Sequence, residues 1–258
     1  MNGRKRGLLA AALLCAAALL CGCQLTGGQQ EARGPLRVGV RDDVEDFGYR
    51  NEKTGRYYGL EIDLARELAS RLGYDGAAFV SVNPQTREQA LESGEVDCVI
   101  ACFSVTAERS ERLDFSTPYY TDRTRILVED SSMINTVRAL RGCTIAVLKD
   151  AGNRQEVSRA FEETGLFDGE NAVVFAEMDT YEEMDAALET GAVDAMCLDG
   201  SVAWGYYDDD RSRLDMEVGE QHYAVATRKG SPLSAPIDEA VRALLEEGVM
   251  DSLTEKWL

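Results

Sequence analysis

The stretch GLEIDLARELASRLG (59–73) lies between two short apolar runs, LRVGV (36–40) and AFVSV (78–82). Its leucines recur at every fourth residue, which places them on one face of an amphipathic helix, and its final glycine is a natural helix end. The flanking runs are short and apolar, as strands are. The stretch therefore predicts a strand–helix–strand unit, which is the repeating element of α/β proteins with parallel strands.

Strand-like and helix-like segments continue to alternate along the rest of the chain. Further strands are predicted at residues 96–101, 125–128, 144–148, 172–176, 193–198 and 223–227, and further helices at 86–93, 153–165, 181–189 and 236–257, with a short one from residue 107. Because the pattern runs through twice, we expect two α/β lobes, each a mostly parallel sheet flanked by helices, joined by two crossing strands around a cleft. The expected lobes are residues 36–127 plus 225–258 and residues 128–224, and residues 41–53 are expected to be a polar loop.

The first 35 residues have a different composition. Three basic residues at positions 4–6 precede a short Leu/Ala-rich run up to Cys21, which is the signature of a secretory signal. The run ends in LCGC (20–23), which resembles a bacterial lipobox, so we expect a signal peptide at residues 1–22 and a lipid on Cys23. A plain signal peptide with incidental cysteines is the alternative. Residues 23–35, rich in Gly and Gln, are expected to form a flexible tether to the outer face of the bacterial cell membrane.

The charge balance and the cysteines argue against two classes of function. The chain has 46 Asp and Glu against 27 Lys and Arg, a net charge of −19, which argues against nucleic acid or anionic lipid as a partner. Cys98, Cys102, Cys143 and Cys197 lack the spacing of metal ligands, and His222 is the one histidine of the sequence. We therefore predict neither a metal nor a cofactor.

Several longer stretches resemble one protein family. VGVRDDVEDFGY (38–49), TREQALESGEVDCVIACFSVTAERSERLDFSTPYY (86–120) and VDAMCLD (193–199), together with residues 59–73, are similar to the extracellular solute-binding proteins for polar amino acids. The resemblance covers nearly all of the chain after the tether. It implies the two-lobed fold of type II periplasmic binding proteins, a free amino acid as ligand, and the permease and ATPase of an ABC transporter as partners of a monomeric receptor.

Arg109 and Asp199 are the expected partners of the amino acid's two charged groups. Arg109 lies in the first turn of the helix after Thr106, where the helix dipole favours an anion, and its guanidinium can hold a carboxylate bidentately. Asp199 follows the strand 193–198, at the strand end where α/β proteins form ligand crevices, and would pair the ammonium. The family uses matching residues in these roles. The alternatives are a solvated helix arginine and an aspartate that caps a turn.

The resemblance implies further ligand contacts around these two residues. It places backbone N–H groups at Cys102 and Ser104 on the α-carboxylate. Gly152 and Asn153 lie where further backbone N–H groups reach a carboxylate, and Tyr181 matches a tyrosine that reaches the ligand from the second lobe.

Arg41 and Arg87 decide the expected ligand. They match positions that supply cations to the second carboxylate in aspartate- and glutamate-binding members, and no carboxylate of the matched set opposes them. Because burying two uncompensated cations is costly, we expect glutamate or aspartate as the ligand. Glutamine or a cysteine-like amino acid is the alternative, in which case Arg41 would pair with Asp42 and Asp43 at the surface.

Two features depart from the family, and one other class of function is open. Leu60 stands where an aromatic residue commonly packs on the ligand, and Asp150 beside Gly152 would oppose a carboxylate if it pointed inward. Some dehydratases share this fold, so a cleft enzyme is the remote alternative to a binding protein. We expect no catalysis, because Ser104 has no evident base and His222 stands alone.

Overall fold

The computed structural model describes residues 33–169, 171–214 and 220–258. The predicted signal peptide, Cys23 and most of the predicted tether lie outside these residues. No helix in the described part has both the length and the apolar character that a membrane span needs. Residues 34–258 form one compact unit that contains two mixed sheets.

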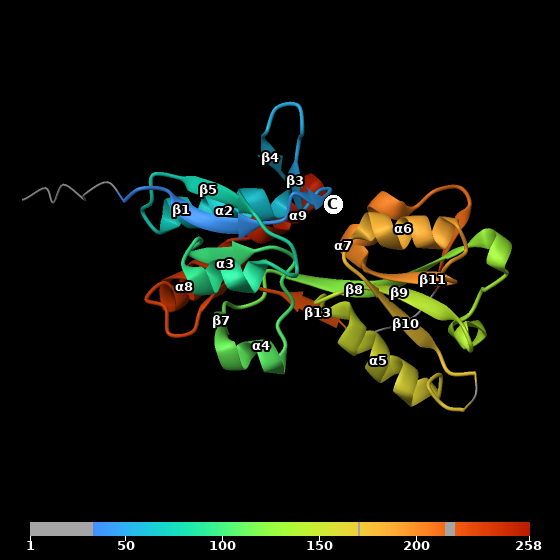
Figure 1. Ribbon diagram of the computed structural model, residues 1–258. Helices are drawn as coiled ribbons and strands as arrows, with labels where there is room; N and C mark the ends of the chain where they lie inside the picture. The colour runs from blue at the N-terminus through green and yellow to red at the C-terminus, as the bar shows by residue number, and fades with distance from the viewer. Residues whose placement is uncertain (1–32, 170, 215–219) are drawn as a thin grey trace, which may run out of the picture. The chain divides into compact units, whose positions relative to one another are not determined.

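The first sheet has the strand order β5-β1-β6-β14-β7. Figure 1 labels three of its strands, β1, β5 and β7. Its strands are β1 (Leu36–Val40), β5 (Ala77–Ser81), β6 (Cys98–Ile100), β7 (Leu113–Phe115) and β14 (Ala226–Arg228). β1 pairs in parallel with β5 and β6, whereas β14 pairs antiparallel with β6 and β7. The last strand of the chain therefore returns to the first sheet.

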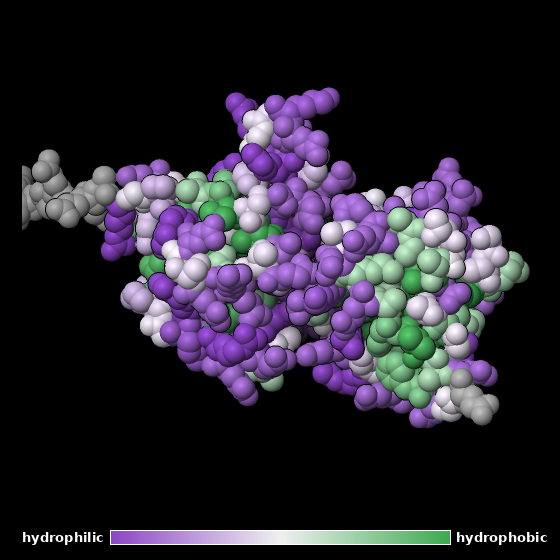
Figure 2. All heavy atoms as spheres, viewed as in Figure 1, coloured by the Kyte–Doolittle hydropathy of each residue, from purple (hydrophilic) through white to green (hydrophobic). Residues whose placement is uncertain are grey.

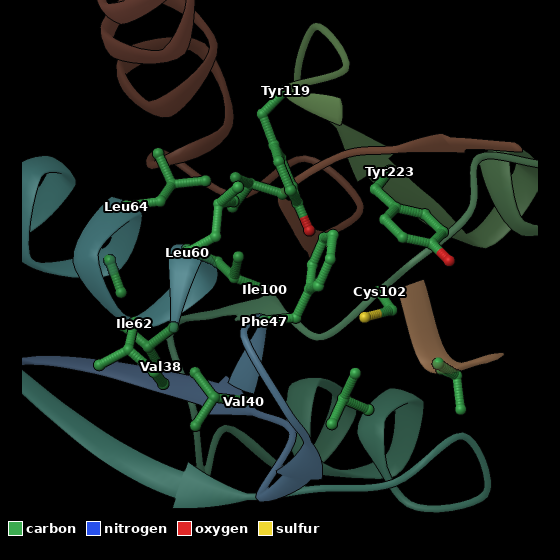
Figure 3. Packing of buried hydrophobic residues seen from close by; sticks show 14 of the residues in the cluster. Val38, Val40, Phe47, Leu60, Ile62, Leu64, Ile100, Cys102, Tyr119 and Tyr223 are labelled. Atoms are coloured by element: carbon green, nitrogen blue, oxygen red, sulfur yellow. The ribbon is translucent and has the colours of Figure 1, made fainter. Parts of the chain in front are cut away.

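Helices cover both faces of the first sheet. α2 (Leu60–Arg71) packs with α8 (Ser234–Glu246) and α9 (Val249–Trp257) on one face, and α3 (Arg87–Ser93) lies on the other. Alternate residues of β1 face α2, and Figure 3 shows them with the first residues of that helix in one cluster. β6 shows the same alternation, since its outer residues join the α2 cluster and its central residue joins the α3 cluster. The period of two thus buries β6 on both faces.

The second sheet has the order β10-β9-β11-β8-β12, with β13 paired to β8 as well. These strands are β8 (Tyr120–Glu129), β9 (Thr144–Leu148), β10 (Val174–Met178), β11 (Ala195–Asp199), β12 (Arg211–Leu214) and β13 (Glu220–Tyr223). β9 pairs in parallel with β10 and β11, and β8 pairs antiparallel with its neighbours. α5 (Asn153–Thr164) and α6 (Tyr181–Glu189) flank the two faces of this sheet. The predicted α/β architecture is confirmed.

Two segments of the chain pass side by side between the sheets. One joins β7 to β8 and the other joins β13 to β14, and they are bonded through Tyr119 N–H to the Tyr223 carbonyl (2.9 Å) and Ser116 N–H to the Val225 carbonyl (2.9 Å). The predicted lobe boundary after residue 127 falls inside β8, and the one after residue 224 falls between β13 and β14. Both boundaries stay predictions.

Three predicted segments differ from the structure. The single strand predicted at 223–227 is divided between β13 and β14. Residues 41–53 are not a plain loop, because β2 (Asp43–Val44) and β3 (Gly48–Arg50) pair there and β4 (Tyr57–Tyr58) extends the ribbon. The prediction of a single helix at 236–257 is wrong, because Gly248 adopts φ +71° and separates α8 from α9. The remaining helical segments are α4 (Ala107–Arg112), α7 (Gly200–Ala203), η1 (Asp130–Ser132), η2 (Val137–Leu140) and η3 (Trp204–Tyr206).

Candidate ligand-binding site

The nine residues predicted to contact a ligand gather between the two sheets, and all of them are buried. We call them the central cluster, which comprises Arg41, Arg87, Cys102, Ser104, Arg109, Gly152, Asn153, Tyr181 and Asp199. Charged side chains are costly to bury unless hydrogen bonds or opposite charges compensate them. The partners of each charged group therefore indicate what the cluster can bind.

Arg109 is turned inward from the short helix α4. Its backbone N–H donates to the Thr106 hydroxyl (3.2 Å), which caps the helix as predicted. Its guanidinium donates to the carbonyl oxygens of Ser104 (3.0 Å) and Asp150 (2.9 Å), and Glu88 lies 3.6 Å from its Nε. Burial lowers the pKa of Arg109, with Glu88 acting against that shift. A solvated helix arginine is therefore excluded.

Arg87 is a buried cation held by carbonyl groups. Its guanidinium donates to the carbonyl oxygens of Ala101 (3.0 Å) and Asp150 (3.3 Å), and its Nε is buried without a partner. Among the described residues, no carboxylate lies within ion-pair distance of it. Burial, followed by the charges of Arg109 and Arg41, lowers its pKa to about 9. Arg87 is therefore the cation of the cluster with the least compensation.

An aromatic ring supports both guanidiniums, and the sequence analysis did not single it out. The guanidinium carbons of Arg87 and Arg109 lie 4.0 Å and 4.9 Å from the ring centroid of Phe103. Leu60, at the position where relatives commonly carry an aromatic residue, is fully buried in the core. The aromatic ring beside Arg87 and Arg109 therefore comes from the loop after β6.

Arg41 has a carboxylate partner, so the prediction that none opposes it is wrong. Its Nε and Nη2 donate to the two carboxylate oxygens of Asp43 (2.8 and 2.6 Å), and its guanidinium lies 5.4 Å from the ring centroid of Tyr181. The cause is local, because the turn into β2 folds Asp43 back onto Arg41. The surface alternative is only half right, since Arg41 pairs with Asp43 but is buried.

Asp199 ends β11 and is buried beside Gln221 of β13. The Gln221 amide nitrogen donates to its carboxylate. Burial and the nearby charge of Asp122 raise the pKa of Asp199 to about 6. Its side chain does not cap α7; Asp122 instead accepts from the Ser201 N–H (2.9 Å). The turn-capping alternative is therefore excluded, and Asp199 is an acceptor inside the cluster.

Gly152 and Asn153 begin α5 at the second sheet. A Cβ on Gly152 would lie 2.7 Å from the Ser104 Oγ and 2.8 Å from the Gln221 Oε1, so this close approach requires glycine. Asn153 donates to the Cys197 carbonyl (3.4 Å), and its Oδ1 is buried without a partner. Close packing at Gly152 thus brings the second sheet against the loop after β6.

Asp150 contacts the arginines through its backbone. Its φ is +59°, its carbonyl oxygen accepts from Arg87 and Arg109, and the residue as a whole is exposed. The carbonyl, and not the carboxylate, is therefore the group that Asp150 presents to the two guanidiniums.

The backbone N–H of Cys102 is bonded to a residue that the sequence analysis missed. Cys102 adopts φ +45° and donates its N–H to Glu61 Oε1 (2.7 Å). Glu61 is fully buried, also accepts from the Tyr119 hydroxyl, and has a raised pKa because of burial. Glu61 therefore fixes the loop that carries the central cluster, and the N–H of Cys102 has a partner within the protein.

A cavity of about 860 Å³ opens beside the central cluster. Arg109, Asp150 and Gly152 line it together with polar residues of α4 and α5. Figure 2 shows that hydrophilic residues dominate the surface between the two sheets. A cavity of this size lies within the range of small-molecule sites, which span about 300–1,000 Å³.

Residues 36–258 match the bacterial extracellular solute-binding proteins, family 3, and the chain belongs to that family. It is 27% identical to the ABC transporter glutamine-binding protein GlnH of Bacillus subtilis over 226 residues, which cover 85% of this chain and 80% of that protein. The family is one of extracellular proteins, so the chain is extracytoplasmic.

Two solved structures are similar to this chain over most of its length. An ancestral arginine-binding protein bound to arginine is 30% identical with a TM-score of 0.74, covering 88% of this chain and 99% of that one. An ancestral amino acid-binding protein, described as a precursor of cyclohexadienyl dehydratase, is 29% identical with a TM-score of 0.73, covering 87% and 95%. The predicted type II periplasmic binding protein fold is confirmed.

Proposed function

We propose that this protein is the lipid-anchored receptor of an ABC importer and that it captures a free amino acid. The observation that carries the proposal is that one cluster contains both buried guanidiniums and a buried carboxylate, that of Asp199. A free amino acid carries a carboxylate and an ammonium, and each needs an opposite partner once water is excluded. The names of the relatives, which bind glutamine or arginine, support an amino acid as the ligand.

The ligand that suits the cluster best is glutamate or aspartate. Within the part of the chain that the structure describes, Arg87 has no carboxylate partner, and Arg109 shares its distant partner Glu88 with Arg112. An acidic amino acid brings one carboxylate for each of the two buried guanidiniums, while its ammonium meets Asp199. The preference for an acidic ligand therefore rests on Arg87 and Arg109, because Asp43 neutralises Arg41.

Glutamine is the second candidate, and the ion pair of Arg41 with Asp43 favours it. The pair offers a donor and an acceptor side by side, which suits a neutral amide. A ligand of this kind would leave Arg87 bonded only to carbonyl groups, and that cost makes glutamine second.

A thermal-shift screen of the twenty amino acids on the purified protein tests the receptor function. One acidic amino acid should raise the melting temperature most, because ligand that binds the folded state stabilises it. Mass spectrometry of the recovered ligand should show the unchanged amino acid at one molecule per chain. A steady release of product would instead indicate the cleft enzyme, and no shift with any amino acid would refute the receptor.

The lipid anchor is tested separately in a bacterial host. The wild type should be extracted from membranes only with detergent and should carry an acylated Cys23 in mass spectrometry. Cys23→Ser should abolish the modification and leave the protein uncleaved or free of the membrane. An unmodified mature N-terminus at another residue would refute the lipobox and leave the plain signal peptide.

A further inference from the structure

Gln221 lies at the centre of the predicted site although no ligand contact was assigned to it. It belongs to β13 and has 2% of its surface exposed. Its Oε1 accepts from the Ser104 hydroxyl (2.5 Å), and its Nε2 donates to the Asp199 carboxylate and to the Thr124 hydroxyl (3.2 Å). One amide therefore joins the loop after β6 to the end of β11.

The orientation of this amide follows from its partners. A reversed amide would place its oxygen against the Asp199 carboxylate, which offers only acceptors when ionised. Gly152 also packs against the amide oxygen, since an added Cβ would lie 2.8 Å from it. The amide is therefore held with its nitrogen toward Asp199 and its oxygen toward Ser104.

This orientation determines the hydrogen-bonding role of Ser104. Its single hydroxyl proton is committed to Gln221, so the oxygen can only accept further hydrogen bonds. Asp199 likewise keeps acceptor capacity after it has bonded to Gln221. Ser104 and Asp199 thus present two acceptors. They complement an ammonium, which has three donors and no acceptor.

We propose that Gln221 is a positioning residue that makes Ser104 and Asp199 joint acceptors for the α-ammonium of the ligand. The inference rests on the proposed function, and it explains how the site would distinguish an amino acid from an analogue without the α-amino group. Without the amide, the Ser104 proton could turn toward the ligand and Asp199 would lose a donor.

Asp199 also depends on Gln221 for its charge. The hydrogen bond from Gln221 acts against burial and the charge of Asp122, which raise the pKa of Asp199 to about 6. The other titratable groups that interact with Asp199 come from several elements and are Arg87, Arg109, Tyr181, Tyr223, Cys102 and Cys197. Loss of the amide donor should raise this pKa further. On acidification, Asp199 would then become protonated, and ammonium binding would be lost, at a higher pH than in the wild type.

The test compares Gln221→Met, which keeps the length of the side chain but not its hydrogen bonds, with the wild type. Calorimetry with L-glutamate and glutarate, and with L-glutamine and glutaramic acid, measures the preference for the amine. The variant should bind the amino acid at least about tenfold more weakly while its affinity for the des-amino analogue changes little. When the pH is lowered, the affinity of the variant for the amino acid should also begin to fall at a higher pH than the affinity of the wild type does.

Gln85→Met is the matched control. Gln85 also joins the two sheets, since its amide nitrogen donates to the Lys149 carbonyl (3.1 Å), but its side chain forms no hydrogen bond with Ser104 or Asp199. Its loss should weaken the amino acid and the des-amino analogue by the same factor. The same parallel loss in Gln221→Met would show a merely structural role and would overturn the inference.

Gln221→Glu carries the test if the methionine variant does not fold. A protonated glutamic acid can donate to Asp199 as the amide does, so affinity for the amino acid should rise as the pH falls from about 7 toward 6, opposite to the wild type. A fall parallel to the wild type would overturn the inference. If the wild type binds neither glutamate nor glutamine, the proposed function fails and this inference fails with it.

Discussion

The two sheets bring opposite kinds of group to the central cluster. From the side of the first sheet come three buried guanidiniums, those of Arg41, Arg87 and Arg109. From the side of the second come the carboxylate of Asp199 and the backbone carbonyl of Asp150. The first side is short of negative charge, and the second side is short of positive charge.

The charge of the site is therefore set by the residues on each of its two sides and not by the net charge of the protein. The chain carries a net charge of −19, yet the side of the first sheet presents cations that carbonyl dipoles compensate only in part. A zwitterion matches both sides when its carboxylates lie toward the first sheet and its ammonium toward the second. Substitutions that remove charge from one side alone should therefore have separable effects.

The largest effect is expected when the cation side loses Arg109. Arg109→Ala should weaken binding of the amino acid by about 2–5 kcal/mol, because it leaves the α-carboxylate buried without its charge partner. Arg112→Ala, on the same helix but half exposed and paired with Glu88, should leave affinity nearly unchanged. Titration calorimetry on both folded variants measures the difference, and equal affinities would remove Arg109 from the site.

Removal of Asp199 should affect stability and binding in opposite directions. Because its folded-state pKa of about 6 lies above the unfolded value of 3.8, this carboxyl favours folding below about pH 4 and loses that contribution as the pH rises through 6. Asp199→Asn should therefore stabilise the ligand-free protein by about 3 kcal/mol at neutral pH, and by less than about 1 kcal/mol near pH 4.

Denaturant unfolding at the two pH values measures this gain, and calorimetry should show that the same variant loses most of its affinity. A variant that is less stable than the wild type at neutral pH would mean that Asp199 is a structural ion-pair partner and not an acceptor awaiting an ammonium.

The smallest effect separates the two remaining arginines. Arg87→Met should reduce the preference for glutamate over glutamine by at least about tenfold, or 1.4 kcal/mol, because it removes the uncompensated cation. Arg41→Met combined with Asp43→Asn removes a compensated pair at constant net charge and should change that preference by less than about threefold. Competition calorimetry measures both ratios. The reverse order of effects would place the side-chain carboxylate at Arg41.

The sequence predicted the periodic elements of the fold well. β1 and α6 were predicted with their observed bounds, and α5 to within one residue. The C-terminal helix was predicted as one because its apolar period continues across Gly248, and a single left-handed residue does not disturb that period. Short paired strands such as β2 and β3 were missed because they have no apolar alternation to reveal them.

The sequence predicted the central cluster through residue types and a family resemblance, and it missed what depends on three-dimensional contacts. Asp150 contributes a backbone carbonyl, which every residue has, so no side chain could signal it. Glu61 looked like a polar position on a helix, and Gln221 lay outside the predicted strands, so only packing shows that both are buried. The burial of Arg41 was predicted without a carboxylate partner, and its pairing with Asp43 was predicted only for the surface, so the combination of the two was missed.

Calorimetric titration of the wild type with glutamate, aspartate, glutamine and arginine at neutral pH measures which ligand the site prefers. Two undercompensated guanidiniums and one carboxylate should favour a ligand with two negative groups and one positive group. Glutamate or aspartate should bind one molecule per chain, at least about tenfold more tightly than glutamine, and arginine should not bind measurably. Tighter binding of glutamine or arginine than of either acidic amino acid would contradict the account.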